Sequence, residues 1–337
     1  MERNSTPDFK TLLQKYSKDG VIPQRLRDIM HQFYSSYKEA LTGGDKSMRD
    51  FELLFVTFLE LIKEQCLSPF SFQPYHQQVR EPFDYYAFGV ELLRPLVDMQ
   101  HSSVSGQDRL KKITSYLEKG ENVIFFANHQ IEADPQAISI LLEKLNPNLG
   151  REMIFVAGER VLTDPLAMPF SMGRNLLCIY SKRYIDTPPE LKSHKQMHNK
   201  RTMERMSELL SQGGKAIYVA PSGGRDRPNA QGVVEVAPFD SQSIEMFYLM
   251  SKKAHKPTHF FPLALATHDL LPPPADIQVE LGERRTAKAG GIHLAFGPEV
   301  DMENFPGREL SDKHERRQAR ADYICNLVKQ DYSRFPS

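Results

Sequence analysis

The sequence predicts an α/β protein, in which a mixed, mainly parallel sheet is covered by helices and preceded by a small helical bundle. From about residue 110 onward, short apolar runs alternate with longer segments of helical periodicity, which is the pattern of a parallel or mixed sheet with covering helices. Before about residue 80, apolar residues recur at helical spacing between short connections, as in a bundle. We therefore expect a helical bundle over 1–80 and an α/β domain over 81–337.

The first part of the chain is expected to form four helices. The clearest helical spacing is that of Phe51, Leu54, Phe55, Phe58, Leu59 and Ile62. A Gly43-Gly44 pair and the proline-rich stretch 68–74 separate these segments, because glycine and proline interrupt regular structure. The expected helices cover residues 8–17, 24–42, 47–66 and 85–99. No residue in this region indicates chemistry.

The second part is expected to alternate strands and helices. The strands are short, rich in β-branched and aromatic residues, and bounded by turn residues. They are expected over 122–127, 152–157, 176–180, 215–220, 258–266, 276–281 and 292–296. The helices are expected over 134–146, 194–211 and 242–254.

The composition is that of an ordinary globular protein, with 40% apolar and 26% charged residues among 337. Lysine plus arginine and aspartate plus glutamate both number 43, so no overall positive field favours nucleic acid as a partner. The cysteines Cys66, Cys178 and Cys325 lack the spacing of a zinc site, and they favour a reducing compartment. Apolar runs stay too short to span a bilayer, and we expect a soluble protein without a signal peptide.

The stretch from Val123 to Pro135 carries the strongest sign of chemistry. An apolar run that reads as a buried strand stops at Asn128 and His129. Five residues after His129 comes Asp134, next to a proline and at the start of an apolar-periodic helix. A histidine thus lies at the carboxyl end of a strand and a carboxylate at the beginning of the next helix. In open α/β sheets, ligands bind at that edge.

Such a pair suits general base catalysis. A neutral imidazole can take a proton from a hydroxyl near pH 7, and a carboxylate on its other nitrogen fixes the tautomer and stabilises the imidazolium. By itself the pattern has another interpretation, because Asp134 could serve only as a helix cap and His129 only as the residue that ends a strand. Taken in isolation, the spacing is too short to decide between the two.

A second apolar strand ends in the glycine-rich loop Pro221-Ser222-Gly223-Gly224-Arg225-Asp226-Arg227. Two glycines let the backbone approach a ligand, and exposed N–H groups in such turns bind anions. The guanidinium groups of Arg225 and Arg227 match phosphate oxygens in pairs. The alternative is a surface turn whose arginines pair with Asp226 or other nearby acids.

Two further stretches repeat the theme of a strand that leads into a polar segment. The first, from Gly173 to Tyr184, ends in the cationic residues Lys182 and Arg183. The second, over residues 259–266, is apolar but contains Pro262. Proline inside a strand predicts an edge strand or a bulge, often beside a site.

These four stretches, in this order, resemble the glycerophospholipid acyltransferase superfamily. The matching residues are Asn128-His129 with Asp134, then the arginine-containing stretch 173–183, then Pro221 to Arg225, then Phe261-Pro262-Leu263. The residue sequence of the first and third stretches is similar to that of the soluble glycerol-3-phosphate 1-acyltransferases of plant plastids and their relatives in some bacteria, including chlamydiae. The likeness covers roughly residues 80–300. It implies the glycerol-3-phosphate acyltransferase fold.

The resemblance also implies a reaction and its residues. His129, oriented by Asp134, would take the proton of the sn-1 hydroxyl of glycerol 3-phosphate, which then attacks a fatty acyl thioester. Arg183, Arg225 and Arg227 would bind the phosphate, with Lys182 as a further candidate. The product is 1-acyl-sn-glycerol 3-phosphate, and neither a metal nor a cofactor is expected.

The sequence departs from the family pattern at two points. Many superfamily members carry glutamate at the position of Ser222, whereas the plastid type has serine there, as this sequence does. Where the plastid enzyme has a Lys-His pair in its phosphate pocket, the sequence reads Arg183-Tyr184. For the oxyanion of the reaction, the backbone N–H groups of Gly223 and Gly224 are candidate donors.

The remaining expectations concern alternatives, partners and location. Acylation of lysophosphatidate at position 2, or a non-catalytic lipid- or carrier-binding module, are the other functions compatible with this fold. The resemblance implies acyl carrier protein or coenzyme A as donor, and a peripheral membrane contact for product release. The expected location is the cytoplasm of a bacterium or the plastid stroma. Candidate docking residues for an acidic carrier are Lys111, Lys112, Lys313, Arg316, Arg317 and Arg320, since the last four fall mostly on one helix side.

Overall fold

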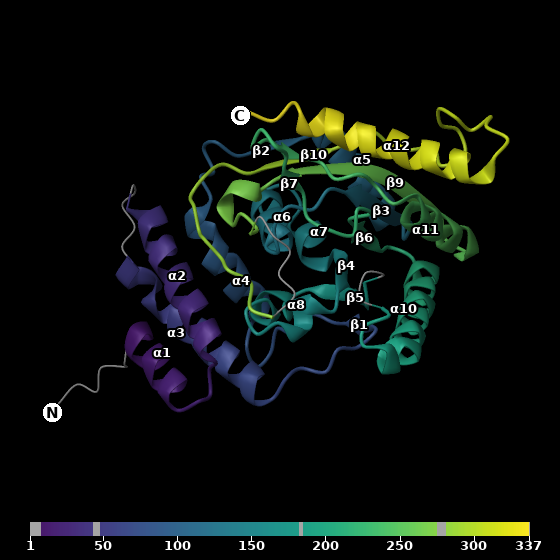
Figure 1. The fold of residues 1–337 in the computed structure, drawn as a ribbon. Helices are drawn as coiled ribbons and strands as arrows, with labels where there is room; N and C mark the ends of the chain where they lie inside the picture. The colour runs from purple at the N-terminus through teal and green to yellow at the C-terminus, as the bar shows by residue number, and fades with distance from the viewer. Residues whose placement is uncertain (1–7, 43–47, 182–184, 275–280, 337) are drawn as a thin grey trace.

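The computed structural model describes residues 8–42, 48–181, 185–274 and 281–336. An eight-stranded sheet runs through the middle of the molecule, and helices pack on both of its faces (Figure 1). The expected fold class, a mixed and mainly parallel sheet covered by helices, is confirmed. The strand expected over 276–281 lies, apart from its last residue, outside the described part of the chain.

The sheet has the order β1-β5-β4-β6-β3-β9-β10-β2. Five neighbours, from β5 to β9, run parallel, whereas β10 is antiparallel to β9 and β1 is antiparallel to β5. The strands are β1 (Tyr75–His76), β2 (Ser103–Ser105), β3 (Asn122–Ala127), β4 (Ile154–Gly158), β5 (Asn175–Ile179), β6 (Ala216–Val219), β9 (Thr258–Ala266) and β10 (His293–Phe296). A separate antiparallel pair is formed by β7 (Arg227–Pro228) and β8 (Val234–Glu235).

The expected helices are found to within a few residues of their predicted bounds, and several further helices were not expected. They are α1 (Phe9–Lys18), α2 (Gln24–Leu41), α3 (Met48–Leu67), α4 (Tyr85–Leu93), α5 (Gln107–Glu118), α6 (Asp134–Leu142), α7 (Pro147–Glu152), α8 (Arg160–Thr163), α9 (Met168–Ser171), α10 (Lys192–Gln212), α11 (Ser241–Lys253) and α12 (Lys313–Tyr332). The helix expected to reach residue 99 changes to a 3-10 turn at Arg94, because Pro95 lacks the N–H that an α-helix needs.

Helix α5 was not expected from the sequence, because its apolar positions are sparse. It buries Leu110 and Ile113 against the sheet while the rest of its surface is polar. Its start depends on Gly106, which has a φ of 72°. A Cβ at this position would lie 2.3 Å from the carbonyl oxygen of Phe296. Only glycine meets both conditions, the left-handed backbone and the close approach.

The central strand β3 is buried on both faces. Its side chains alternate between two apolar cores, with Val123 and Phe125 on one face and Ile124 and Phe126 on the other. The first core includes the N-terminal helices and α6, and the second includes α10, α11 and α12. Such a continuous apolar run is typical of a parallel strand covered on both sides. His129, just after this strand, is therefore held by a rigid element.

The N-terminal helices lie together on one side of the molecule (Figure 1), but their core continues into the sheet. The ring of Phe58 in α3 lies 5.9 Å from that of Phe88 in α4 and 5.3 Å from that of Phe170 in α9. The sheet also takes a strand, β1, from within the first 80 residues. The domain boundary near residue 80 stays a prediction.

Pro262 predicted an edge strand or a bulge, and the first of these was wrong, because strand β9 is not an edge strand. It pairs with β3 on one side and β10 on the other. The Pro262 carbonyl still accepts a hydrogen bond within the sheet, from the N–H of Gly297 just after β10, at 2.8 Å. A Cβ on Gly297 would lie only 2.9 Å from the Pro262 ring, so glycine provides the space. The N–H that proline lacks falls where β10 has already ended.

The basic residues of α12 do not form one exposed face, contrary to expectation. Arg320 is 6% exposed and forms an ion pair with Glu245 of α11. Arg317 contacts the same carboxylate at 3.0 Å, and Arg316 donates to the Leu310 carbonyl at 2.8 Å. These cations are used to pack α12 against its neighbours. None of the helices within the described residues has the length and apolar content needed to cross a membrane.

Candidate active site

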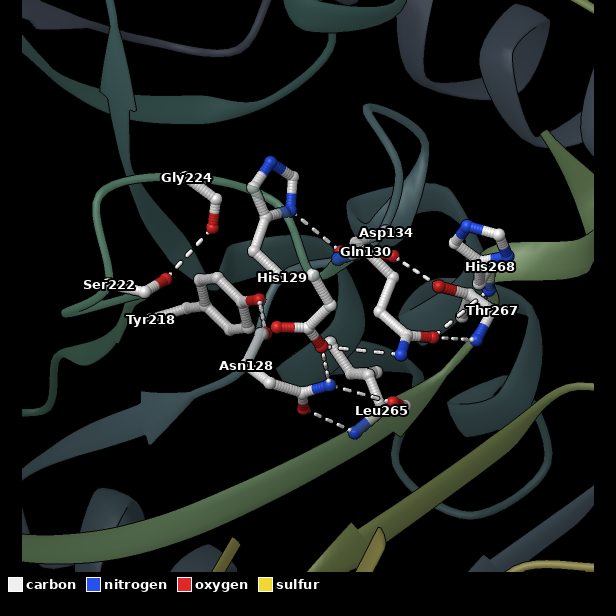
Figure 2. A network of polar contacts seen from close by, with 11 residues as sticks. Asn128, His129, Gln130, Asp134, Tyr218, Ser222, Gly224, Leu265, Thr267 and His268 are labelled. Carbon is white, nitrogen blue, oxygen red and sulfur yellow. Dashed lines mark hydrogen bonds and ion pairs between the residues drawn. The ribbon is translucent and has the colours of Figure 1, made fainter. Parts of the chain in front are cut away.

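The candidate site lies where the parallel strands end. Because β3 and β6 are parallel neighbours, their carboxyl ends meet at the same edge of the sheet. His129 follows β3, and the glycine-rich loop follows β6. Helix α6 begins at Asp134, five residues beyond His129. Two stretches that are about 90 residues apart in the chain are thereby brought together (Figure 2).

His129 and Asp134 form a hydrogen-bonded pair, with Nδ1 2.8 Å from the carboxylate Oδ2. A carboxylate can only accept, so Nδ1 carries the proton and Nε2 carries the lone pair. Nε2 points away from the carboxylate and out of the polar network (Figure 2). The Asp134 side chain is 1% exposed, whereas that of His129 is 30% exposed. A buried carboxylate thus orients an imidazole whose other nitrogen a substrate can reach.

The helix-cap interpretation of Asp134 does not agree with the geometry. Asp134 is the first residue of α6, Ala133 occupies the cap position, and this cap makes no side-chain hydrogen bond. The carboxylate oxygens of Asp134 instead accept from His129, from the backbone N–H of Gln130 at 2.8 Å and from the hydroxyl of Thr267 at 2.5 Å.

A buried network beneath His129 fixes the loop that carries it. The Asn128 amide donates to Asp226 Oδ2 at 2.7 Å and to the Leu265 carbonyl at 2.9 Å, while its oxygen accepts from the Leu265 N–H at 2.8 Å. The Tyr218 hydroxyl donates to the Asn128 carbonyl at 2.6 Å. Both Asn128 and Asp226 are fully buried. The loop after β3 is therefore tied to β6, to β9 and to the glycine-rich loop.

Asp226 connects the base to the two arginines that flank it. Its N–H donates to the His129 carbonyl at 2.6 Å, and its Oδ1 accepts from the Ala237 N–H at 2.9 Å. Burial raises the pKa of Asp226 above its ordinary value, and the hydrogen bonds from Ala237 and Asn128 oppose this shift. The alternative in which Asp226 pairs with the arginines is not observed, because its carboxylate is used inside the network.

The glycine-rich loop turns at Gly223, which has a φ of 65°. The Gly223 N–H donates to the Ala220 carbonyl at 3.1 Å, so in this conformation it is engaged within the turn. Among the described residues, none accepts a hydrogen bond from the Gly224 N–H. The Gly224 carbonyl accepts from the Ser222 hydroxyl at 2.8 Å. Gly224 is therefore the better placed of the two oxyanion candidates.

Four charged side chains form two ion pairs beside the base. Arg225 contacts Glu283 at 2.6 and 2.8 Å, and Arg285 pairs with Glu132. Burial alone would raise the pKa of Glu132, but Arg285, Arg225 and His129 hold it below its usual value. Arg227, the other candidate phosphate ligand, donates to the Pro274 carbonyl.

These ion pairs line a pocket that is open to solvent. Its charged lining residues include Glu132, Arg225, Glu283 and Arg285, and its apolar walls come from Phe170 and from the prolines 272–274. Glu132 follows His129 by three residues in the chain, but His129 itself is not among the lining residues. A lining that combines charged and apolar side chains suits an amphipathic substrate.

The two other predicted phosphate ligands, Lys182 and Arg183, and the neighbouring Tyr184 lie outside the described residues. The preceding strand, β5, ends at Ile179 on the same edge of the sheet as His129. Within the described part of the chain, no cluster of three or more His, Cys, Asp or Glu side chains is arranged to hold a metal ion.

Sequence reasoning missed several members of this site. Thr267, Gln130 and the acids that pair with the arginines, Glu132 and Glu283, gave no pattern by themselves. For Thr267 a signal did exist, because it directly follows the strand 258–266, and the ends of parallel strands meet at one edge. Glu283 comes from a segment of irregular structure, where periodicity gives no guide.

The mixed sheet, together with a histidine–aspartate pair at the ends of its strands, defines an acyltransferase-type protein. A family model described as "Acyltransferase" matches residues 102–266, which contain the pair, the glycine-rich loop and most of the strands.

The relatives are more specific. A chloroplastic glycerol-3-phosphate acyltransferase of Cucurbita moschata is 38% identical over 336 residues, which are 99% of this chain and 72% of the relative. The Arabidopsis thaliana chloroplastic enzyme is 35% identical over 98% of this chain and 73% of its own length, and that of Spinacia oleracea is 36% identical over 98% and 70%. The chain belongs to the glycerol-3-phosphate acyltransferase family.

Among solved structures, a 1-acyl-sn-glycerophosphate acyltransferase from Thermotoga maritima shares 16% sequence identity with this chain. The match covers 96% of this chain and 94% of that one, with a TM-score of 0.38.

Proposed function

We propose that this protein transfers a fatty acyl group from a thioester to the sn-1 hydroxyl of glycerol 3-phosphate, forming 1-acyl-sn-glycerol 3-phosphate. The observation that carries the proposal is the His129–Asp134 pair, in which Nδ1 is bonded to a buried carboxylate and Nε2 is accessible. Membership of the glycerol-3-phosphate acyltransferase family supports the choice of acceptor. The reaction is the first acylation of glycerophospholipid synthesis.

The proton moves through His129 in both directions. Nε2 takes the proton of the acceptor hydroxyl as its oxygen attacks the thioester carbonyl, and a tetrahedral oxyanion forms. The C–S bond then breaks, and the imidazolium returns the proton to the leaving thiolate. Asp134 stabilises the imidazolium between these two steps. Both substrates meet in one complex, so an acyl-enzyme is not needed. The Gly224 N–H is the proposed oxyanion donor.

The substrate phosphate is proposed to bind between the glycine-rich loop and the loop after β5. Arg225 and Arg227 supply guanidinium groups from the first loop, and Arg183 and Lys182 are the candidates from the second. In the present structure Arg225 is held by Glu283 at 2.6 Å. A phosphate would compete with this carboxylate for the guanidinium group of Arg225, because each anion can present two oxygens to its N–H donors.

The choice of acceptor is tested by an assay of purified protein with an acyl thioester and either glycerol 3-phosphate or lysophosphatidate. We expect acyl transfer to glycerol 3-phosphate, with the new ester at position 1, as chromatography of the products would show. Transfer only to lysophosphatidate would replace the proposal with the position-2 activity. Binding of either lipid without turnover would favour a non-catalytic module.

The acyl donor is proposed to be an acyl carrier protein, with coenzyme A thioesters as the alternative. We place the reaction in the plastid stroma, in agreement with the chloroplastic relatives; a bacterial cytoplasm is the alternative. No cofactor is proposed, and product release is proposed to involve transient contact with a membrane surface. Because the chain has equal numbers of positive and negative residues, an acidic carrier must recognise a local basic surface.

The first half of α10 is better placed for this role than α12. Its residues Lys192, Lys200 and Arg201 are exposed, with Lys192 2.9 Å from Asp186 and Lys200 3.9 Å from Glu204. The hydroxyl of Thr202 and the imidazole of His198 bind the Cys178 carbonyl, which places the middle of α10 near the end of β5. Three strand spacings, roughly 14 Å, separate β5 from β3.

Charge reversal on α10, and separately at two lysines outside it, tests which surface the carrier binds. We expect Lys200→Glu with Arg201→Glu to lower kcat/KM for a carrier-bound donor about tenfold or more at low salt, and to change coenzyme A use much less. The effect should shrink at physiological salt, because exposed charges are screened. The matched control is Lys111→Glu with Lys313→Glu, two exposed lysines elsewhere. A larger effect of the control pair would place the carrier on the other surface, and equal effects on both donors would exclude α10.

A further inference from the structure

Thr267 is a buried residue that contacts the carboxylate of the candidate base pair. It directly follows β9 and is 2% exposed. Its hydroxyl donates to Asp134 Oδ1 at 2.5 Å, while Oδ2 accepts from His129 Nδ1 and from the Gln130 N–H, both at 2.8 Å. Each oxygen of Asp134 is therefore held from a different direction, one by β9 and the other by the loop after β3 (Figure 2).

The backbone of Thr267 is fixed independently of its hydroxyl. Its N–H donates to the Gln130 side-chain oxygen at 2.6 Å, and its carbonyl accepts from the Leu270 N–H at 3.1 Å. The Gln130 oxygen also accepts from the His268 N–H at 3.0 Å. These bonds hold the segment in place even without the hydroxyl. The contact with Asp134 is thus an additional interaction and is not needed to position the loop.

The hydroxyl restricts the rotation of the carboxylate. If Oδ1 lacked this donor, the carboxylate of Asp134 could turn about its Cβ–Cγ bond, and the contact between Oδ2 and His129 Nδ1 would lose its fixed geometry. An imidazole that changes orientation or tautomer is a poor base. The alternative is that the hydroxyl merely satisfies a buried polar atom and affects only folding.

We propose that Thr267 is a positioning residue, which acts through Asp134 to fix the orientation and tautomer of His129. The proposal rests on the proposed function of His129 as the general base. It extends the histidine–aspartate pair to a three-residue relay from two different strand ends. Thr267 itself does not contact the substrate in this arrangement.

The change in pH dependence has a defined sign. Without the Thr267 hydroxyl, the Asp134 carboxylate is held less firmly against His129 Nδ1 and stabilises the imidazolium less. Protonated His129 is then disfavoured, and the acid limb of the kcat profile moves to lower pH. The other charged or titratable groups near the pair are Glu132, Arg225 and Asp226, with His268 next to Thr267 and the phenol of Tyr218 beneath the network. They are the same in each variant.

The test compares two variants at this position. Thr267→Val keeps the size and shape of the side chain but removes the hydroxyl, and Thr267→Ser keeps the hydroxyl. We expect Thr267→Val to lower kcat about tenfold, the effect of one lost hydrogen bond to a charged group. KM for glycerol 3-phosphate should change little, and the acid limb of the kcat profile should move to lower pH. Thr267→Ser should retain most of the kcat and the original pH profile.

Thr202→Val is the matched control for the loss of a buried threonine hydroxyl. Thr202 is fully buried in α10, and its hydroxyl donates to the Cys178 carbonyl at 2.7 Å, away from the base. Assayed with a coenzyme A thioester, which does not depend on the proposed carrier surface, this variant is expected to be less stable than wild type, with unchanged kcat and pH profile per folded molecule. An NMR titration of the His129 ring nitrogens, in the wild type and in each variant, gives a second readout that does not require turnover.

The outcomes separate the possible roles. Thr267→Val with the wild-type kcat, pH profile and His129 titration would overturn the proposal and leave a purely structural hydroxyl. Equal impairment in Thr267→Ser would also overturn it, since the methyl group would then be the important part. If the wild-type enzyme acylates a different acceptor, the proposed function fails, but the same variants assayed with that acceptor and the titration still decide the role of Thr267.

Discussion

His129→Ala is expected to lower kcat by at least ~10²-fold, the usual contribution of a positioned general base. The physical reason is that Nε2 is the accessible acceptor for the hydroxyl proton, and Nδ1 is already engaged by Asp134. The KM for glycerol 3-phosphate should change little, because the proposed phosphate contacts come from other side chains. Steady-state kinetics at saturating acyl donor measure both parameters.

His259→Ala provides a matched control for this experiment. His259 also hydrogen-bonds to carboxylates, those of Glu121 at 2.8 Å and Glu299 at 2.6 Å. It lies near the start of β9, at the end of the sheet opposite to the base. We expect loss of stability without loss of kcat per folded molecule. A His129→Ala enzyme with near-normal kcat would contradict the proposed mechanism, whatever the control shows.

Arg225→Ala and Arg227→Ala are each expected to raise KM for glycerol 3-phosphate about ten- to a hundredfold. A lost charged hydrogen bond is worth ~1.5–3 kcal/mol, which corresponds to this range. The KM for the acyl donor should change less, because the phosphate belongs to the acceptor. Initial rates with each substrate varied in turn separate the two constants.

The structure makes Arg225 a demanding case, because it also forms a buried ion pair. Removal of the Arg225 side chain leaves the Glu283 carboxylate without its partner, so the Arg225→Ala variant should unfold more easily than wild type. Glu283→Gln breaks the same pair but keeps the guanidinium, and it should not raise KM. If both variants are destabilised and both keep the normal KM, Arg225 has a structural role and does not bind the phosphate.

Local patterns in the sequence determined the elements that carry the site. The apolar run over 122–127 is followed by Asn128 and His129, and Asp134 with Pro135 starts a segment of helical apolar periodicity. Both features depend on neighbouring residues only, through side-chain alternation, helical periodicity and proline geometry. The strand over 258–266 was predicted with its observed bounds for the same reason. The positions of His129 at the end of a strand and of Asp134 at the start of a helix follow directly from these patterns.

Other expectations failed because burial is not a local property. Pro262 indicated an edge strand or a bulge, but β9 lies inside the sheet, where Gly297 on the facing segment leaves room for the proline ring. The arginines of α12 looked like an exposed basic face, but Arg320 is buried against an acid from α11. In both cases the neighbouring residue is distant in the chain, and local sequence patterns do not show that it lies nearby.

Only the tertiary structure decided what surrounds the base. Thr267 is 133 positions from Asp134, Asp226 is 98 positions from Asn128, and Glu283 is 58 positions from Arg225. Each contact depends on which strands are neighbours and in which register, and thus on the packing of the whole sheet. A single sequence shows that a strand exists and where it ends. It does not give the order of the strands, and it is this order that brings the three partners to one edge.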